Sequence, residues 1–399
     1  MFLKNTPFFS YYMMGDVMRC ERCGNEEPRY FYEDNQGVYC RKCIMFGRVD
    51  VGKPMMKVPV KKRKIVCDYH LDYPLTPKQK QAVASIMYYL RQHQDVLVYA
   101  ACGAGKTELT MEAIKTYLNQ GKKVGFAIAR RQVVLEIAER MQAAFPMLKV
   151  VAVCEGHTHV SDGDLIVCTM HQLYRYYGWF DLLIMDEVDA FPYRGNPLLA
   201  RIAAYACAGE KMMLTATPDE EMKQLALHGK LMMVELFSRP HGYPLIVPTI
   251  RQLPKAVQYL YLFQYLLRQR KRDIQTLVFV PTIALAKSLY QIYRWMFKCQ
   301  VFTSLTTNKE QIIDEFHQKK YECLFSTTVL ERGITIRGIY ILIIQADHPV
   351  FNEASLIQMI GRVGRKKENP TGEGVFLCQR KTKDIIACVN AIQKMNESI

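Results

Sequence analysis

The chain has 399 residues, of which 50% are hydrophobic and 23% are charged, so it has a globular composition and is long enough for two or three domains. Its formal net charge of +15 favours a polyanionic partner, either nucleic acid or an anionic membrane surface. No stretch reaches the apolar length of a membrane span, which excludes an integral membrane protein and leaves only peripheral membrane association.

The first residues and the cysteine count bear on the compartment in which the chain works. The segment from Met1 to Met18 is rich in aromatic residues and methionine, but Asp16 interrupts it. It has neither a basic start nor a small-residue cleavage site, so we expect no secretory signal. Thirteen cysteines in a chain that is not exported indicate a reducing cytosol, in which thiols bind metal or stay free.

Two cysteine pairs near the start have the spacing of a structural zinc site. Cys20 and Cys23 form one C-x-x-C pair, Cys40 and Cys43 form the other, and 16 residues separate them. Residues 35–37 between the pairs are typical of a hairpin turn. Four thiolates close the coordination sphere of zinc, so the site would stabilise a small domain and not catalyse a reaction. The alternative is four unrelated free thiols.

A basic linker follows these cysteines, and we place the module with its linker at residues 1–65. Whether the module contacts DNA or a protein partner stays open. A charged run of this kind is more often a solvated tether than a binding site.

Two longer regions follow, at residues 66–238 and 239–399. Both alternate short apolar runs with helical patterns, which is typical of parallel sheets with crossover helices. A proline-rich segment beginning at Arg239 separates them. The fold class is therefore α/β, with two tandem α/β domains behind a small zinc module. The predicted buried strands are 96–99, 124–129, 165–167, 182–185, 276–280, 323–326 and 340–344.

Residues 100–107, Ala-Ala-Cys-Gly-Ala-Gly-Lys-Thr, have the pattern of a phosphate-binding loop. They follow a predicted strand and precede a helical pattern, which is the context that this motif requires. Lys106 would reach the β- and γ-phosphates of ATP, and the Thr107 hydroxyl would coordinate Mg²⁺. Read alone, the segment could be a glycine-rich turn. The backbone N–H groups expected to contact phosphate are those of Gly103, Ala104 and Gly105.

Asp186 and Glu187 directly follow the predicted strand 182–185. Adjacent carboxylates at the exit of a buried strand are costly unless they serve a cation. Asp186 would hold Mg²⁺, and Glu187 would orient and deprotonate the attacking water. An acidic loop is the alternative, and the phosphate-binding loop upstream weighs against it.

Residues 358–365, Gln-Met-Ile-Gly-Arg-Val-Gly-Arg, lie in the second α/β region and begin with Gln358. Arg362 and Arg365 are three residues apart and therefore share one helix face. Guanidinium groups placed on the γ-phosphate would stabilise the charge of phosphoryl transfer. Without the other motifs, a basic surface helix would be the better interpretation.

Together these segments resemble superfamily two helicases, in which two RecA-like lobes close on ATP and step along nucleic acid. The resemblance covers roughly residues 70–399. It implies that Gln79 reads the adenine base and that residues 215–218 link the ATP site to the nucleic-acid path. Many of these helicases carry aspartate where this chain has Thr335, which puts the ribose contact there in question. The nucleic-acid contacts that the resemblance implies are Arg130, Arg131, Thr169, Gln172, Thr282, Thr327 and Thr328.

Three features resemble the ComFA family, the competence ATPases of Gram-positive bacteria. They are the four-cysteine module ahead of the helicase core, residues 186–193, and residues 239–242 between the lobes. Membership implies a motor that pulls single-stranded DNA into the cell during transformation, at the cytoplasmic face of the membrane, with ATP, Mg²⁺ and Zn²⁺ as cofactors. It also implies a competence phosphoribosyltransferase-like protein and the membrane DNA channel protein as partners.

Two other functions compete with this one. A primosomal-type replication-restart 3'-5' DNA helicase also combines zinc with these motifs, but there the zinc residues interrupt the helicase core, whereas here they precede it. A non-catalytic zinc-dependent DNA-binding scaffold would not need Lys106, Asp186, Glu187, Arg362 and Arg365, all of which are present. The motifs indicate translocation and do not require strand separation.

Overall fold

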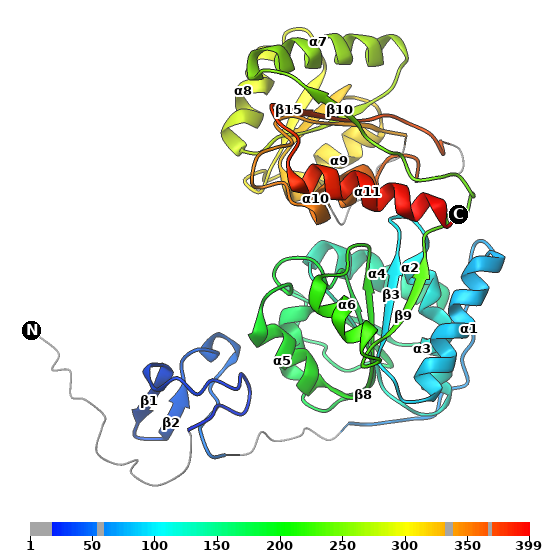
Figure 1. The fold of residues 1–399 in the computed structure, drawn as a ribbon. Helices are drawn as coiled ribbons and strands as arrows, with labels where there is room; N and C mark the ends of the chain where they lie inside the picture. The colour runs from blue at the N-terminus through cyan, green and yellow to red at the C-terminus, as the bar shows by residue number, and fades with distance from the viewer. Residues whose placement is uncertain (1–17, 54–59, 332–337, 366–368) are drawn as a thin grey trace, which may run out of the picture.

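The computed structural model describes residues 18–53, 60–331, 338–365 and 369–399. They form a small N-terminal module and two lobes, each built around its own sheet (Figure 1). In the module, β1 (Phe31–Asp34) and β2 (Gly37–Cys40) pair antiparallel, which confirms the predicted hairpin. Short 3₁₀ helices η1 (Pro28–Tyr30) and η2 (Ile44–Phe46) flank it.

The first lobe contains a seven-stranded sheet in the order β5-β6-β4-β7-β8-β3-β9, and all neighbouring strands are parallel. Its central strands are apolar and buried, as the continuous hydrophobic runs predict. The strands are β3 (Val96–Ala100), β4 (Val124–Ile128), β5 (Val150–Val153), β6 (Leu165–Thr169), β7 (Phe180–Asp186), β8 (Cys207–Thr215) and β9 (Met232–Leu236). The helices are α1 (Pro77–Arg91), α2 (Lys106–Leu109), α3 (Met111–Asn119), α4 (Arg131–Ala144), η3 (Met170–Arg175), α5 (Pro197–Ala206) and α6 (Glu220–Leu227).

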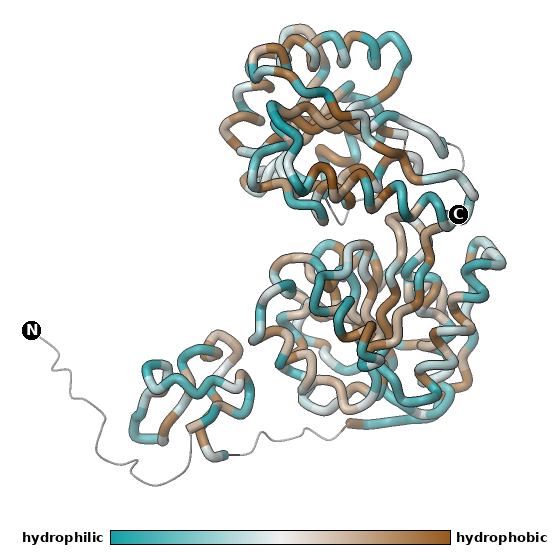
Figure 2. Tube along the Cα trace, viewed as in Figure 1, coloured by the Kyte–Doolittle hydropathy of each residue, from teal (hydrophilic) through white to brown (hydrophobic). Residues whose placement is uncertain are grey.

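The second lobe repeats this design with a six-stranded parallel sheet in the order β10-β15-β14-β11-β13-β12. In both lobes the hydrophobic colouring concentrates on the inner strands (Figure 2). The strands are β10 (Thr249–Gln252), β11 (Thr276–Phe279), β12 (Cys299–Phe302), β13 (Cys323–Ser326), β14 (Tyr340–Ile343) and β15 (Gly374–Cys378). The helices are α7 (Lys255–Lys271), α8 (Ile283–Tyr293), α9 (Lys309–His317), η4 (Thr328–Leu330), α10 (Glu353–Ile360) and α11 (Lys383–Glu397).

The two lobes touch through α10, α11 and the segment that joins them, on the side of the second lobe that faces β3 and α1 (Figure 1). Lys78 Nζ of α1 donates to the Ile399 carbonyl at 2.6 Å. The Asn396 side chain exchanges hydrogen bonds with both backbone groups of Leu245 in the connecting segment. A separate contact, between the Cys102 thiol and Gln358, joins the loop after β3 to α10.

The described part of the basic linker lies on the first lobe. Lys62 pairs with Asp181 at 2.7 Å, and Arg63 pairs with Asp164 at 2.7 Å. These two cations are therefore paired with carboxylates of the first lobe, so this part of the linker is not a solvated tether. Among the described residues, no helix is both long and apolar enough to cross a membrane.

Candidate functional site

The phosphate-binding motif forms a tight loop between β3 and α2. Gly103 and Gly105 adopt positive φ values of 82° and 88°, which side chains rarely tolerate. A Cβ atom at Gly105 would also lie 2.5 Å from Gln79 Nε2. Lys106 and Thr107 then begin α2, and Thr107 is buried. The loop thus has the backbone geometry that phosphate binding requires.

Three side chains donate hydrogen bonds to backbone carbonyl groups of this loop. Lys106 Nζ donates to the Ala100 carbonyl at 3.0 Å, and Gln79 Nε2 donates to the Ala104 carbonyl at 2.9 Å. Arg239 Nε donates to the carbonyl of Cys102 at 2.9 Å. Within the loop, the Ala104 N–H donates to the Ala101 carbonyl at 3.1 Å. Together these contacts fix the conformation of the loop.

Gln79 has a structural role in addition to the adenine contact implied by resemblance. It completes a capping box with Thr76 at the start of α1, because its Oε1 accepts from the Thr76 N–H at 2.9 Å. The same amide holds the phosphate loop, so it couples α1 to the loop. Its adenine-reading role stays a prediction.

Asp186 and Glu187 lie at the carboxyl end of β7, close to the loop in the sheet. The strand order places only β8 between β7 and β3. Burial first, and then the neighbouring Glu187 charge, raise the pKa of Asp186 to about 7, while Lys106 opposes the rise. Glu187 has a φ of 53°, and its Oε2 atom is buried without a hydrogen-bond partner among the described residues. Such a carboxylate pair fits a divalent cation and a bound water.

A third carboxylate joins this segment to the strand that lies between β7 and β3. Asp189 accepts from Thr215 Oγ1 at 2.7 Å and from Thr217 Oγ1 at 2.6 Å. The Thr217 N–H in turn donates to Thr215 Oγ1 at 2.9 Å. A shift of the acidic segment would therefore be passed on to residues 215–217.

In the second lobe, Arg365 lies beside the phosphate loop, whereas Arg362 Nε donates to the Glu331 carbonyl of its own lobe at 3.2 Å. Arg365 Cγ lies 3.5 Å from the position that a Cβ atom at Gly103 would occupy. Arg362 is buried, and burial together with Arg365 lowers the pKa of its guanidinium to about 9, so it stays charged at neutral pH. The charge of Glu187, in the first lobe, opposes that shift.

Gln358 also faces the loop across this boundary. Its Oε1 accepts from the Cys102 thiol at 3.2 Å. A Cβ atom at Gly361 would lie 2.5 Å from the Cβ atom of Cys102, so α10 and the loop are in close contact. The structure thus places Gln358 and Arg365 beside the phosphate loop, and the roles in ATP chemistry assigned to the site residues stay predictions.

The residues predicted to contact nucleic acid follow the carboxyl ends of strands in both lobes. Thr169 ends β6, Thr282 follows β11 and caps α8, and Thr327 follows β13. Arg130 follows β4 and donates to the Val329 carbonyl of the other lobe at 2.8 Å. Thr335 lies outside the described residues. The remaining predicted contacts occupy helix starts or turns beside these positions: Arg131, Gln172 and Thr328.

The four predicted zinc ligands come together. Their sulfur atoms all lie within 4.8 Å of one another, with 3.7 Å between Cys20 and Cys43 and 3.5 Å between Cys23 and Cys40. Sulfur atoms around a tetrahedral zinc with Zn–S bonds of about 2.3 Å would be about 3.8 Å apart. The cluster therefore fits a closed four-thiolate zinc site.

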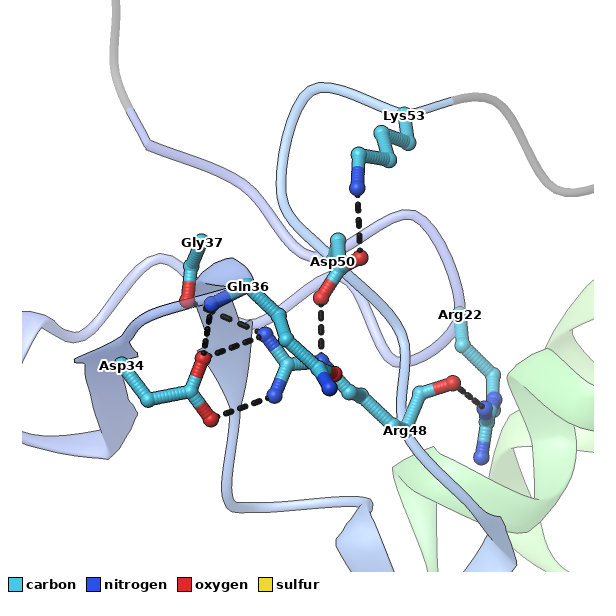
Figure 3. A network of polar contacts seen from close by, with 7 residues as sticks. All are labelled: Arg22, Asp34, Gln36, Gly37, Arg48, Asp50 and Lys53. Atoms are coloured by element: carbon cyan, nitrogen blue, oxygen red, sulfur yellow. Dashed lines mark hydrogen bonds and ion pairs between the residues drawn. The ribbon is translucent and has the colours of Figure 1, made fainter.

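An ion-pair network supports the module around this cluster (Figure 3). Arg48 donates to Asp34 Oδ1 at 2.9 Å and to Asp50 Oδ1 at 2.5 Å. Lys53 also pairs with Asp50, at 2.9 Å, and Arg22 donates to the Arg48 carbonyl. Arg48 and Lys53 are thus paired with carboxylates of the module itself.

The module packs against the first lobe through an aromatic contact that the sequence did not predict. The Phe46 ring stacks on His171 with centroids 6.1 Å apart and packs on Tyr174 at 5.5 Å. Gly24 lies against Arg201 of α5, where a Cβ atom would be 2.5 Å from Nη1. His171 and Tyr174 belong to η3, so the module supports an element that carries predicted strand-binding residues.

Two parallel-sheet lobes, with a phosphate loop and acidic pair on one and arginines on the other, define a DNA-dependent, helicase-like ATPase of superfamily two. Residues 72–220 match the family described as type III restriction enzyme, res subunit, and residues 257–367 match the helicase conserved C-terminal domain. Residues 6–57 match the competence protein ComFA N-terminal domain.

Competence protein ComFA of Bacillus subtilis (strain 168) is 31% identical over 95% of this chain and 86% of its own length. ComFA of Streptococcus pneumoniae (strain R6) is also 31% identical, over 95% of this chain and 90% of its own. The chain belongs to the ComFA family, as its motifs predict.

Solved structures confirm the predicted arrangement of two RecA-like lobes. RecG bound to a three-way DNA junction is similar with a TM-score of 0.59 and 20% identity, over 82% of this chain and 47% of that one. Dbp5 of S. cerevisiae, bound to RNA and ADP BeF3, has a TM-score of 0.58 and 16% identity, over 82% and 92% of the two chains. At such identities the likeness concerns the fold alone.

Proposed function

We propose that this protein is an ATP-driven single-stranded DNA translocase that powers DNA uptake in natural transformation. The observation that supports it most is the approach of Arg365, and of the turn that carries Arg362, to the phosphate loop of the other lobe. A catalytic site divided between two lobes couples nucleotide turnover to their relative motion. The competence names of the two relatives supply the biological setting.

In this proposal the N–H groups of the loop and Lys106 bind the phosphates of ATP. Thr107 and Asp186 hold Mg²⁺, which offsets the phosphate charge. Glu187 orients a water molecule and accepts its proton as the water attacks the γ-phosphate. Arg362 and Arg365 stabilise the negative charge that develops on the transferred group.

Hydrolysis then moves the lobes relative to the strand. The hydrogen bonds of Asp189 to Thr215 and Thr217 connect the acidic segment to the edge of the sheet on which strand contacts are predicted. Arg130 already bridges the lobes through the Val329 carbonyl, so its contacts change when they separate. Strand contacts to phosphate groups carry no base information, so we expect no sequence preference.

The setting of the motor is also part of the proposal. We place it in the cytoplasm at the inner face of the membrane, in peripheral association. Its partners would be a competence phosphoribosyltransferase-like protein and the membrane DNA channel protein. The net charge of +15 is compatible with both a DNA strand and an anionic membrane surface. Zinc in the cysteine cluster completes the set of cofactors.

Translocation is tested by stopped-flow fluorescence with single-stranded oligonucleotides that carry a fluorophore at either end. A translocase gives a lag that grows with oligonucleotide length when the fluorophore lies at the arrival end. The Glu187→Gln variant, which should bind ATP without turnover, gives no such lag. A lag independent of length in the wild type would contradict directed movement.

A further inference from the structure

Arg239 is a buried arginine to which the proposed ATP chemistry assigns no task. It follows β9, at the start of the segment that connects the lobes, and only 2% of it is exposed. Its guanidinium makes four hydrogen bonds, all to backbone carbonyls. Nε donates to Cys102 at 2.9 Å, Nη1 to Val363 and Gly364 at 2.7 Å each, and Nη2 to Gly361 at 2.8 Å.

These acceptors belong to the two halves of the ATP site. Cys102 lies in the phosphate loop of the first lobe, whereas residues 361–364 form the turn that contains Arg362 and precedes Arg365. One side chain therefore connects the loop to the arginine-bearing turn. It does so with the fixed fork of a guanidinium, whose donors cannot be rearranged independently.

The placement of this charge is costly, which argues against an incidental contact. Desolvation lowers the pKa of Arg239 to about 10, so the group is still protonated at neutral pH. Its four acceptors are carbonyl dipoles and not carboxylates. Gly364 has a φ of 65°, and a Cβ atom there would lie 3.4 Å from Nη1 and 2.4 Å from the Pro370 carbonyl, so the turn fits closely around the guanidinium.

We propose that Arg239 is a positioning residue that holds the turn bearing Arg362 and Arg365 in register with the phosphate loop. It acts through the backbone and does not touch the nucleotide. The inference rests on the proposed hydrolysis of ATP between the lobes and extends it to the connecting segment. Because displacement of a catalytic group by about 1 Å can cost roughly 100-fold in rate, loss of the fork should act mainly on turnover.

The test compares Arg239→Lys with the wild type. Lysine keeps the positive charge but cannot span four carbonyls that belong to two lobes. We expect kcat to fall roughly 30- to 100-fold, while KM for ATP and the affinity for ADP change less than about threefold. ADP with aluminium fluoride is a transition-state analogue. Its affinity should fall in proportion to kcat, because only the transition state requires correctly positioned Arg362 and Arg365.

Two further variants and a folding control complete the design. Arg380→Lys changes an exposed arginine of the same lobe and should match the wild type. His241→Ala removes the other hydrogen bond from the connecting segment to Gly364, of 3.0 Å, and should lower kcat less than about threefold, because the fork stays intact. Melting temperature and zinc content verify that each variant is folded.

Three outcomes would overturn the proposal. One is a kcat of Arg239→Lys within twofold of the wild type. The second is an equal loss of ADP and analogue affinity with a lowered melting temperature, which indicates general damage. The third is an equal loss of kcat in His241→Ala. ATP turnover of each protein is measured both with and without single-stranded DNA. Failure of single-stranded DNA to stimulate turnover of the wild type would refute the proposed function, whatever the result for Arg239→Lys.

Discussion

At the residue scale, Asp186 and Glu187 are neighbours in the chain but lie in different surroundings. Asp186 ends a buried strand, where desolvation raises its pKa, and its carboxylate caps the next N–H group. Glu187 has a left-handed backbone conformation, so the chain turns away from the strand direction at this residue. The two carboxylates can therefore serve a cation and a water molecule separately.

The first prediction concerns Glu187. Replacement by glutamine keeps the size of the side chain but removes the proton acceptor, so ATP hydrolysis should fall by roughly 1000-fold while ATP binding persists. Steady-state turnover and a fluorescent ATP analogue measure the two quantities. Glu139→Gln, on the exposed side of α4, is the matched control. Normal turnover in Glu187→Gln would remove this residue from the role of base.

The second prediction concerns Cys102, which lies in the phosphate loop and is buried against α10. A thiol-alkylating reagent can reach it only when the lobes separate, and the added group then blocks their closure on Gly361. We expect alkylation to inactivate the ATPase and bound nucleotide to slow the inactivation. An equal rate of inactivation in Cys102→Ala would show that another cysteine is responsible.

At the element scale, the contact between η2 and η3 gives the zinc module a mechanical role. Phe46 is largely buried against His171 and Tyr174, whereas Tyr32 on the hairpin is 51% exposed. Several cations of the module are paired with its own carboxylates. The module is thus better suited to supporting η3 than to attracting DNA through charge.

The third prediction follows from this contact. Phe46→Ala should increase hydrogen exchange in η3 and weaken single-stranded DNA binding severalfold, with zinc content and DNA-free turnover unchanged. The cause is the loss of apolar contact, which in a protein core costs about 3–5 kcal/mol. Tyr32→Ala serves as the control on the exposed face. Unchanged exchange in residues 170–175 of Phe46→Ala would mean that the module does not support η3.

Elements with continuous apolar runs could be predicted from the sequence, and others could not. Strands β3, β4, β6, β7, β11, β13 and β14 were expected near their observed positions because both faces of each are buried. Strand β8 extends over Cys207–Thr215 and is not among the predicted buried strands. Residues 208–211 carry polar and exposed positions, so the hydrophobic pattern fails there.

Site residues divide in the same way. The loop, the acidic pair and the arginine pair follow from local motifs whose chemistry is fixed by residue type and spacing. Arg239 could not be found in this way, because its partners lie 122 to 137 residues away and are all backbone atoms. The Phe46 contact with η3 is not predicted either, because it joins aromatic side chains that are far apart in the sequence. Such tertiary contacts depend on the folded arrangement and leave no periodic pattern.

At the scale of the whole molecule, the second lobe contacts the first at the phosphate loop and at α1. The sequence indicated two domains and their order, but not that α11 and the connecting segment would fix the second lobe against α1 and β3. The boundaries at residues 65 and 238 stay predictions. The two sheets span residues 96–236 and 249–378.

The central claim, a nucleotide cycle that responds to single-stranded DNA, is tested most directly by steady-state ATP hydrolysis of the purified full-length protein. Turnover is measured alone and with single-stranded DNA, duplex DNA or single-stranded RNA, with Glu187→Gln as the blank. We predict strong stimulation by single-stranded DNA and little by the other two. Stimulation by RNA, or full turnover without nucleic acid, would contradict the account.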